Sequence, residues 1–261
     1  MDGPLTRPAP AAVQSVDRAL DLLEALARGG RLGLSEAAAA AGLAEGTAHR
    51  LLRTLVARGY VRQDDGRRYG LGTRLLGLGD AARQAAAVAA APYLARLVAV
   101  SGETANLAVL EGDDVVYLAQ VPSAHQLRIF AEVGRHVPPH STAVGKVLLA
   151  GLRDDDVIAL LGRTGLAART PRTSTAVPQV LAALIAARAD GYAVDDEEEE
   201  TGVRCVAVPV VAGGRVVAAL SVSGPTSRLG AEPGLELRSA MWAAAEAFAG
   251  QLPASASSSV R

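Results

Sequence analysis

Cysteine is nearly absent from this chain of 261 residues, which contains only Cys205. A single thiol excludes an intrachain disulfide and a zinc site built from several cysteines. Long apolar runs are also missing, although 50% of the residues are hydrophobic. No uninterrupted run approaches the roughly 18 apolar residues that a membrane-spanning helix needs. The sequence therefore predicts a soluble protein that does not use a membrane as a partner.

The first residues lack the basic start and the apolar stretch of a signal peptide, and contain Asp2 and several prolines instead. Export is therefore not expected, and the predicted location is cytoplasmic. Residues 1–12 are rich in Pro and Ala without periodicity, so we expect a flexible arm. Residues 253–261, PASASSSVR, are expected to form a disordered tail.

Lysine is scarce too, because Lys146 is the only one and arginine carries the remaining positive charge. The net charge of −1 hides an uneven distribution. Residues 1–75 contain eleven Arg and eight acids, a net charge of +3; the rest contains fifteen Lys or Arg and nineteen acids, a net charge of −4. Residues 46–74 hold seven Arg and only two acids, Asp64 and Asp65. Such a local excess is typical of a phosphate-facing surface, and the alternative is a solvated face in an arginine-biased sequence.

Helical periodicity begins at Ser15, which could cap a first helix. Ser35 could cap a short second helix over residues 36–41, and a third helix is expected over residues 47–58. The four residues between the last two helices include a glycine. Two short helices joined in this way are typical of a helix-turn-helix.

The third helix carries polar and basic residues on the face opposite its apolar stripe. A hairpin follows, because residues 60–63 and 67–71 flank Asp64-Asp65-Gly66 and carry arginine on both strands. A basic helix followed by a small hairpin is what a winged helix-turn-helix presents to DNA. The predicted DNA-binding residues are Ser35, Thr47, His49, Arg50, Arg53, Thr54, Arg67 and Arg68.

A long helical segment is expected after the hairpin. Thr73 could cap it, and its Ala-rich part suits a dimer contact. Pro92 should mark a break, or the first turn of a further helix that reaches Gly102. Helix preference alone also explains the alanines. From Thr104 the period changes to two. Strands are expected over 105–110, 114–121, 126–131, 203–211 and 215–223, with helices over 143–150, 154–161, 177–190 and 233–251. This order predicts an α+β protein around an antiparallel sheet.

The last two predicted strands carry the chemistry of a pocket. If their phases align, Cys205, Ser221 and Ser223 line one wall. Opposite, Ser141 or Thr142 could cap a helix whose first backbone N–H groups would suit a carboxylate or similar anion. An ordinary capped helix explains the same residues.

Enzymatic readings are disfavoured. The segment around Gly145 and Lys146 is not a phosphate-binding loop, because His140 stands where the first glycine belongs and Val147 where Ser or Thr belongs. His136 and His140 are separated by Val-Pro-Pro, so they cannot align as a helical metal pair. Cys205, His140 and Asp195 could form a nucleophilic set, but Cys205 lies in mid-strand without a cationic activator. We predict no catalytic residue, no metal and no cofactor.

The sequence resembles the IclR family of bacterial transcription regulators from about residue 13 to residue 252. The N-terminal motifs are VQSVDRALDLLEAL, LSEAAAAAGLAEGTAHRLLRTLVARGYV and RRYGLGTRLLGLG. Later motifs are HSTAVGKVLLA, GYAVDDEEEETGVRCVAVPV and ALSVSGP. The resemblance implies a winged helix-turn-helix over 13–72, a linker helix over 73–91 and a GAF-like effector-binding domain over 92–252. It also implies a homodimer or dimer of dimers on a palindromic operator, more often as a repressor.

The resemblance further implies which residues bind the effector, a small organic acid or a ureide. The most similar branch is the one that responds to allantoin and glyoxylate. One departure is the acidic run of residues 197–200, which is denser than the family's pattern. The competing hypothesis is a metabolite-sensing or catalytic domain with a helical head that does not bind DNA. The implied effector-binding residues are Leu127, Ile129, Ala143, Val144, Asp195, Val203, Cys205, Ser221 and Ser223.

Overall fold

The structure, a computed structural model, describes residues 13–130 and 132–252. The predicted arm over residues 1–12 and tail over residues 253–261 lie outside the described residues. The chain divides into two compact units, Met1–Ala82 and Arg83–Arg261. Each unit has its own hydrophobic core and is described separately.

The N-terminal unit is a winged helix-turn-helix, as the sequence predicted. Leu22, Leu26 and Leu52 are almost fully buried between its three helices, and Val61 of the hairpin joins them. The two strands pair in antiparallel fashion, with Val61 opposite Leu71 and Gln63 opposite Tyr69. The elements are α1 (Gln14–Gly29), α2 (Leu34–Ala40), α3 (Glu45–Ala57), β1 (Val61–Gln63) and β2 (Tyr69–Leu71).

The predicted serine caps of α1 and α2 are wrong. Helix α1 begins at Gln14, so Ser15 already lies inside it, and α2 begins at Leu34. Ser35 sits in the first turn of α2 and cannot cap it, because a capping side chain belongs to the residue before the helix. The start of α2 is satisfied from within, since Glu36 Oε2 accepts a hydrogen bond from the Gly33 N–H at 2.7 Å.

The C-terminal unit contains a six-stranded antiparallel sheet with the order β5-β4-β3-β8-β7-β6, which confirms the α+β prediction. The predicted strand over residues 126–131 is wrong for its described part. Side chains hold that segment instead, because Thr104 Oγ1 donates to the Ile129 carbonyl at 2.8 Å and Arg228 Nη2 donates to the Leu127 carbonyl at 2.9 Å. The strands are β3 (Thr104–Glu111), β4 (Asp114–Val121), β5 (His136–Val137), β6 (Ala193–Asp196), β7 (Val203–Ala212) and β8 (Arg215–Pro225).

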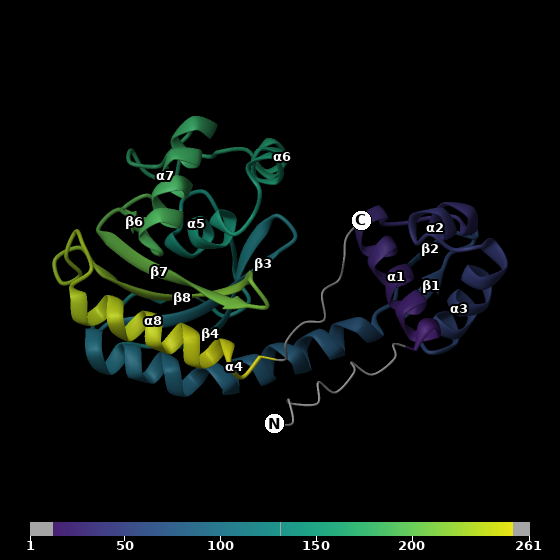
Figure 1. Cartoon of the computed structure of the whole chain (residues 1–261), viewed down its shortest axis with the longest axis horizontal. Helices are drawn as coiled ribbons and strands as arrows, with labels where there is room; N and C mark the ends of the chain where they lie inside the picture. The colour runs from purple at the N-terminus through teal and green to yellow at the C-terminus, as the bar shows by residue number, and fades with distance from the viewer. Residues whose placement is uncertain (1–12, 131, 253–261) are drawn as a thin grey trace, which may run out of the picture. The chain divides into compact units, whose positions relative to one another are not determined.

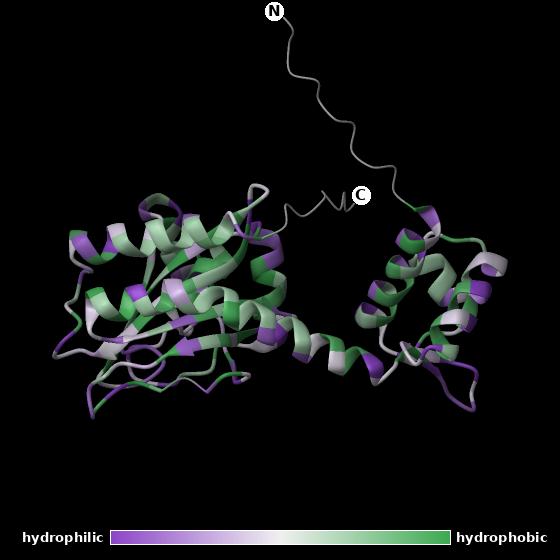
Figure 2. Cartoon of the chain, turned by 90° about the horizontal axis from the view of Figure 1, so that it is seen from below, coloured by the Kyte–Doolittle hydropathy of each residue, from purple (hydrophilic) through white to green (hydrophobic). Residues whose placement is uncertain are grey.

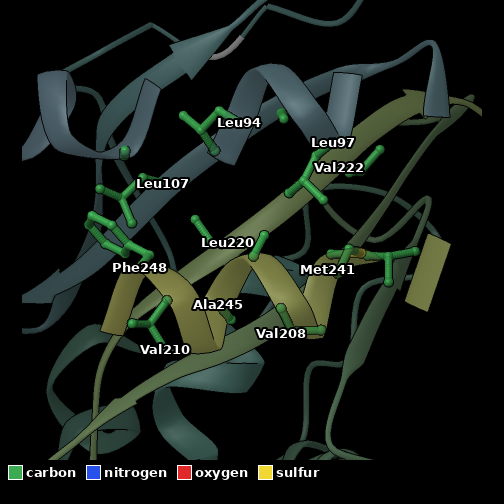
Figure 3. Close-up of a cluster of buried hydrophobic side chains, with 14 of the residues drawn as sticks. Leu94, Leu97, Leu107, Val208, Val210, Leu220, Val222, Met241, Ala245 and Phe248 are labelled. Carbon is green, nitrogen blue, oxygen red and sulfur yellow. The ribbon is translucent and has the colours of Figure 1, made fainter. Parts of the chain in front are cut away.

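Helices cover both faces of this sheet (Figure 1). One face packs against α8 (Leu235–Ala249) and the second half of α4 (Arg74–Ser101). Leu107, Leu220 and Val222 of the strands meet Leu94 and Phe248 of these helices in an entirely apolar layer (Figure 3). Each such buried side chain contributes roughly 1.5–3 kcal/mol. This face is therefore structural. The other face packs against α5 (Ala143–Ala150) and α7 (Val177–Asp190), and α6 (Asp154–Thr164) packs on α7.

Helix α4 is continuous from Arg74 to Ser101, so the predicted break at Pro92 is wrong. Proline inside a helix costs about 3 kcal/mol through one lost hydrogen bond and a steric clash. Burial of Leu94 and Leu97 against the sheet offsets that cost.

By length and composition alone, α4 could also span a membrane: its most apolar 18-residue window has a mean hydropathy of 1.3, and 17% of that window is buried. Figure 2 shows hydrophilic residues between the hydrophobic ones along this helix. Those residues interrupt the apolar run, so the helix contains no uninterrupted apolar stretch of membrane-spanning length.

Candidate functional site

Helix α3 presents polar and basic side chains on the face that points away from the core. Its apolar residues Ala48 and Leu52 are fully buried, whereas Arg50, Arg53 and Thr54 are exposed. Helical periodicity produces this division, since residues three or four apart share a face. His49 is exposed beside them and Thr47 is half-buried.

Positive charge on this face is not neutralised by the protein. Among residues 13–130 and 132–252, no carboxylate forms an ion pair with Arg50 or Arg53. The guanidinium groups of Arg58 and Arg74 each lie 5.8 Å from the centre of the Tyr60 ring. Unpaired guanidinium groups on one surface attract phosphate groups.

The two predicted wing arginines lie in different surroundings. Arg67 is exposed, has a positive φ of 57° in the turn, and makes no ion pair within the described part of the chain. Arg68 turns back onto its own unit: its Nη2 donates to the Arg31 carbonyl at 2.8 Å and to Glu36 Oε2 at 3.0 Å. Arg68 therefore fixes the wing to the start of α2. Ser35 is exposed on the first turn of α2.

A second candidate site is a cavity of about 180 Å³ on the polar face of the sheet. Strand register creates one of its walls. Asp195 pairs with Cys205 across β6 and β7, and Cys205 pairs with Ser223 across β7 and β8, so the three side chains form one row. The cavity is lined by Tyr117, Ile129, Phe130, Arg135, Val137, Thr142, Arg169, Asp195, Glu199, Glu200, Val203, Cys205 and Ser223.

The cavity brings together five of the nine predicted effector-binding residues: Ile129, Asp195, Val203, Cys205 and Ser223. The other four lie elsewhere. Ser221 is in the neighbouring row opposite Ala207, is 1% exposed, and accepts a hydrogen bond from Asn106 Nδ2 at 3.3 Å.

The first residues of α5 explain why that row is covered, since Ala143 and Val144 pack in the same apolar cluster as Ala207. Both are fully buried and do not line the cavity. Leu127 is 72% exposed, and only its backbone carbonyl is held, by Arg228 Nη2 at 2.9 Å.

The sequence did not predict several of the lining residues, and two of them, Arg135 and Arg169, come from segments without periodicity. Arg135 lies in the turn before β5 and Arg169 lies in the loop between α6 and α7. Tyr117 comes from β4, opposite Ala108, after an irregularity in the β3–β4 register. No local pattern in the sequence places these three segments beside Cys205.

Helix α5 begins at the edge of the cavity. Thr142 caps it, because Thr142 Oγ1 accepts from the Gly145 N–H at 3.1 Å. Lys146 follows within the helix, is 5% exposed, forms an ion pair with Glu198 and donates to the Val194 carbonyl at 2.9 Å. These bonds hold the start of α5 against β6.

Two residues of the dense acidic run, Glu198 and Glu199, are built into the protein, whereas Glu200 is exposed. The side chains of Glu198 and Glu199 are 13% and 16% exposed. Glu199 Oε2 accepts from Ser141 Oγ at 2.6 Å, and its Oε1 lies 3.3 Å from Arg169 Nη2. The run therefore forms a charged wall beside the cavity.

Burial controls the protonation of the cavity's acidic groups. Asp195 is 2% exposed, and its desolvation raises its pKa to about 7 against the lowering effect of the Glu198 and Glu199 N–H groups. Burial, and then the nearby Asp195 charge, raises the pKa of the Cys205 thiol. Cys205 is therefore a neutral thiol that donates to Ser223 Oγ at 3.1 Å, and such a thiol is a poor nucleophile. Within the described ranges, no group of three or more His, Cys, Asp or Glu side chains could hold a metal ion.

Comparison with known proteins covers both units. Residues 15–65 match the IclR helix-turn-helix domain, and residues 81–249 match the family described as bacterial transcriptional regulator IclR C-terminal. The regulator BhcR of Paracoccus denitrificans is 38% identical over 221 residues, which cover 83% of this chain and 79% of the relative. The transcriptional repressor IclR of Escherichia coli is 38% identical over 231 residues, or 86% of this chain and 84% of the relative.

Solved structures share the fold. The crystal structure of a transcriptional regulator from Rhodococcus sp. RHA1 aligns with a TM-score of 0.58 at 35% identity. The alignment covers 92% of this chain and 97% of the solved chain.

Proposed function

Because the chain belongs to the IclR family of bacterial transcriptional regulators, it is a DNA-binding transcriptional regulator and not an enzyme, and we propose that a small metabolite in the sheet cavity controls its affinity for DNA. The observation that carries the DNA-binding part of this proposal is the exposed surface of α3 and the wing, where Arg50, Arg53 and Arg67 form no ion pair among the described residues. We also propose that it acts as a repressor and that it works in the cytoplasm, where its DNA target lies.

Helix α3 is the element that would enter the major groove. Arg50, Arg53, Thr54 and Thr47 would contact bases or phosphates, with His49 beside them, while Arg67 would contact the backbone from the wing. A homodimer, or a dimer of dimers, would place two such helices one helical turn apart on a palindromic operator. Arg68 would act indirectly, by fixing the wing through its bonds to Arg31 and Glu36.

The cavity is the proposed effector site. Its wall of Asp195, Cys205 and Ser223 offers hydrogen-bonding groups, and Ile129 and Val203 supply apolar surface. A few converging polar groups on an apolar background are typical of a small-molecule site. The effector would be a small organic acid or a ureide, and the sequence motifs favour the allantoin and glyoxylate branch.

Helix α4 offers a route by which the cavity could influence α3. It begins in the N-terminal unit at Arg74, and its Leu94 and Leu97 are buried against the sheet of the C-terminal unit. An effector that binds one arrangement of the sheet unit more tightly than another would shift the population of that arrangement. The same shift would then change the spacing of the two recognition helices in the oligomer.

Gel-shift titration tests the DNA surface. Arg50→Ala and Arg53→Ala should each weaken operator binding about tenfold or more, since each removes a phosphate or base contact. Arg215→Ala is the matched control, because Arg215 is also exposed and unpaired among the described residues but lies in the other unit. Equal operator binding by all three variants would overturn the proposed surface.

Thermal-shift screening tests the effector site. Purified wild-type protein would be screened with glyoxylate, allantoin, allantoate and aromatic acids, because a ligand that binds only the native state raises the Tm. Ser223→Ala should reduce the shift given by a hit, whereas Ser221→Ala should preserve it, since Ser221 does not line the cavity. Loss of operator binding by Ser223→Ala without ligand would indicate misfolding instead.

A further inference from the structure

The cavity contains two arginines, and only one of them is free to meet a ligand. We propose that Arg135 selects the effector by charge, receiving the carboxylate of a small monocarboxylate at the mouth of the cavity. This inference rests on the proposed effector site and narrows its ligand class. Nothing in the sequence motifs distinguishes Arg135, which lies in an irregular turn.

Arg169 is excluded from this role by its partner. Its Nη2 lies 3.3 Å from Glu199 Oε1, and Glu199 is held in turn by Ser141. The other cations near this wall are also neutralised: Lys146 pairs with Glu198, and Arg204 pairs with Asp196. These groups stabilise the acidic wall and leave no net positive charge for a ligand.

Arg135 differs from all of them. It is exposed and forms no ion pair within the residues that the structure describes. Its backbone is fixed, because the Arg135 N–H donates to the Glu132 carbonyl at 3.0 Å and the Gly134 N–H donates to the Tyr117 carbonyl at 2.8 Å. An unpaired guanidinium on a fixed turn is suited to a carboxylate, which it can bind through two parallel hydrogen bonds.

Electrostatics at Tyr117 support the position of this charge. Burial, and then Cys205, Asp195 and Glu199, raise the pKa of the Tyr117 hydroxyl, while Arg135 acts in the opposite direction. The positive charge of Arg135 therefore reaches the hydroxyl inside the cavity. Tyr117 stays protonated and can donate a hydrogen bond beside the same carboxylate.

The start of α5 is a weaker anchor for that carboxylate. Thr142 is its only contribution to the cavity lining, and Thr142 Oγ1 already accepts from Gly145. Ala143 and Val144, which follow it in the helix, do not line the cavity.

The opposite wall limits the rest of the ligand. Asp195, Glu199 and Glu200 line it, so a second carboxylate would meet like charges. A hydroxyl, aldehyde hydrate or amide could instead bond to Asp195, Cys205 or Ser223. The cavity of about 180 Å³ is also smaller than a typical drug-sized site of roughly 300–1,000 Å³. The ligand class is therefore a small monocarboxylate, not a dicarboxylate and not a neutral ureide.

Calorimetric titration of the full-length protein tests this inference with charge-matched probes. Glyoxylate, 4-hydroxybenzoate and allantoate are the acids, 4-hydroxybenzamide and allantoin are the neutral probes, and malonate is the dicarboxylate. We expect wild-type protein to bind at least one of the monocarboxylates and to bind both neutral probes and malonate at least about tenfold more weakly.

Variants then identify the residue responsible. Arg135→Ala should weaken the bound monocarboxylate at least about tenfold and leave the weak binding of the neutral probe unchanged, and Arg135→Lys should restore part of the affinity. Arg128→Ala is the matched control, because Arg128 is an exposed arginine on the neighbouring segment that does not line the cavity. Operator binding without ligand should be equal in all variants, which separates ligand recognition from folding.

Two results would overturn the inference while the effector site stands: a neutral probe or malonate that binds wild-type protein best, or a monocarboxylate that binds Arg135→Ala as tightly as wild type. Failure of every probe to bind wild-type protein would instead count against the effector site itself, and against the inference with it.

Discussion

The two units differ in how many of their arginines are paired with carboxylates: Arg28, Arg31 and Arg68 are paired in the N-terminal unit, and most of its other described arginines are not. In the N-terminal unit Arg50, Arg53 and Arg67 are exposed without carboxylate partners in the described structure. In the C-terminal unit most arginines are paired, as Arg163 is with Asp113 at 2.7 Å and Arg228 is with Glu103. The arginine that lacks a partner beside the cavity, Arg135, stands out for that reason. An arginine without a carboxylate partner is available to bind an anion, whereas a paired arginine supports the fold.

The two sites also differ in how they are assembled. The proposed DNA-binding face comes from one helix and the adjoining hairpin, whereas the cavity draws residues from five strands, β4 to β8, and from four loops. A site built from one element tolerates change elsewhere. A site built from many elements depends on the packing that brings them together, and the following predictions test that difference.

The largest effect is expected at Gly145, where α5 meets the loop before it. A Cβ added there would lie 2.1 Å from the Pro139 carbonyl oxygen. Gly145→Ala should therefore cost several kcal/mol, lower the Tm by about 10 °C or more and abolish effector binding. The matched control is Gly162→Ala in α6, where no atom lies within 4 Å. It should leave the Tm unchanged or raise it, and equal Tm values for the two variants would contradict the packing described.

A smaller, pH-dependent effect is expected at Asp195. Its pKa rises from the ordinary range near 4 in the unfolded chain to about 7 in the folded protein, so the folded state holds the proton more tightly. This group's contribution to stability is full below about pH 4 and is lost as pH rises towards 7. Asp195→Asn cannot titrate at this position, so its Tm minus the wild-type Tm should increase between pH 5 and pH 8. The corresponding difference in unfolding free energy should change by on the order of 1 kcal/mol per pH unit at most. A constant difference across this range would show that Asp195 is ionised throughout.

Capping separates two hydroxyl residues that look alike in the sequence. Thr142→Ala removes the side chain that accepts from Gly145 and should cost about 1 kcal/mol. Ser35→Ala removes no cap, because Gly33 and Glu36 close the start of α2. Its unfolding free energy should match wild type in urea denaturation. A cost for Ser35→Ala equal to that of Thr142→Ala would show that Ser35 does cap its helix.

The smallest effect on stability is expected in the wing. Arg68→Ala should cost about 0.5–1 kcal/mol, because its bonds to Arg31 and Glu36 are exposed to solvent. Arg67→Ala should leave stability unchanged but reduce the salt dependence of operator binding by about one counterion. Denaturation curves and gel shifts at several salt concentrations measure both quantities. If the two variants behaved identically, the wing arginines would be equivalent.

Local patterns were sufficient for much of the fold. The helical period of α3 places Leu52 in the buried apolar stripe and Arg50 and Arg53 on the exposed face. Asp64-Asp65-Gly66 marked the hairpin of the wing. The alternation in β7 and β8 placed Cys205 and Ser223 on one face, as their pairing in the sheet confirms. These features depend on residues close together in the chain, so the sequence alone determined them.

Tertiary structure decided which residues pack against these elements and which charges are paired. Pro92 stays within α4 because Leu94 and Leu97 are buried on a sheet formed mostly by later residues, and Ser221 is covered because α5 packs over its row. Arg135 and Arg169 differ only because Glu199, distant in sequence from both, lies beside Arg169. Ion pairs and packing between distant segments carry no periodic signal, since the residues that form them are joined by the fold and not by spacing. The sequence determined the family, the recognition helix and the hydrogen-bonding strand face, and the folded chain decided which of its charges remain free to bind a partner.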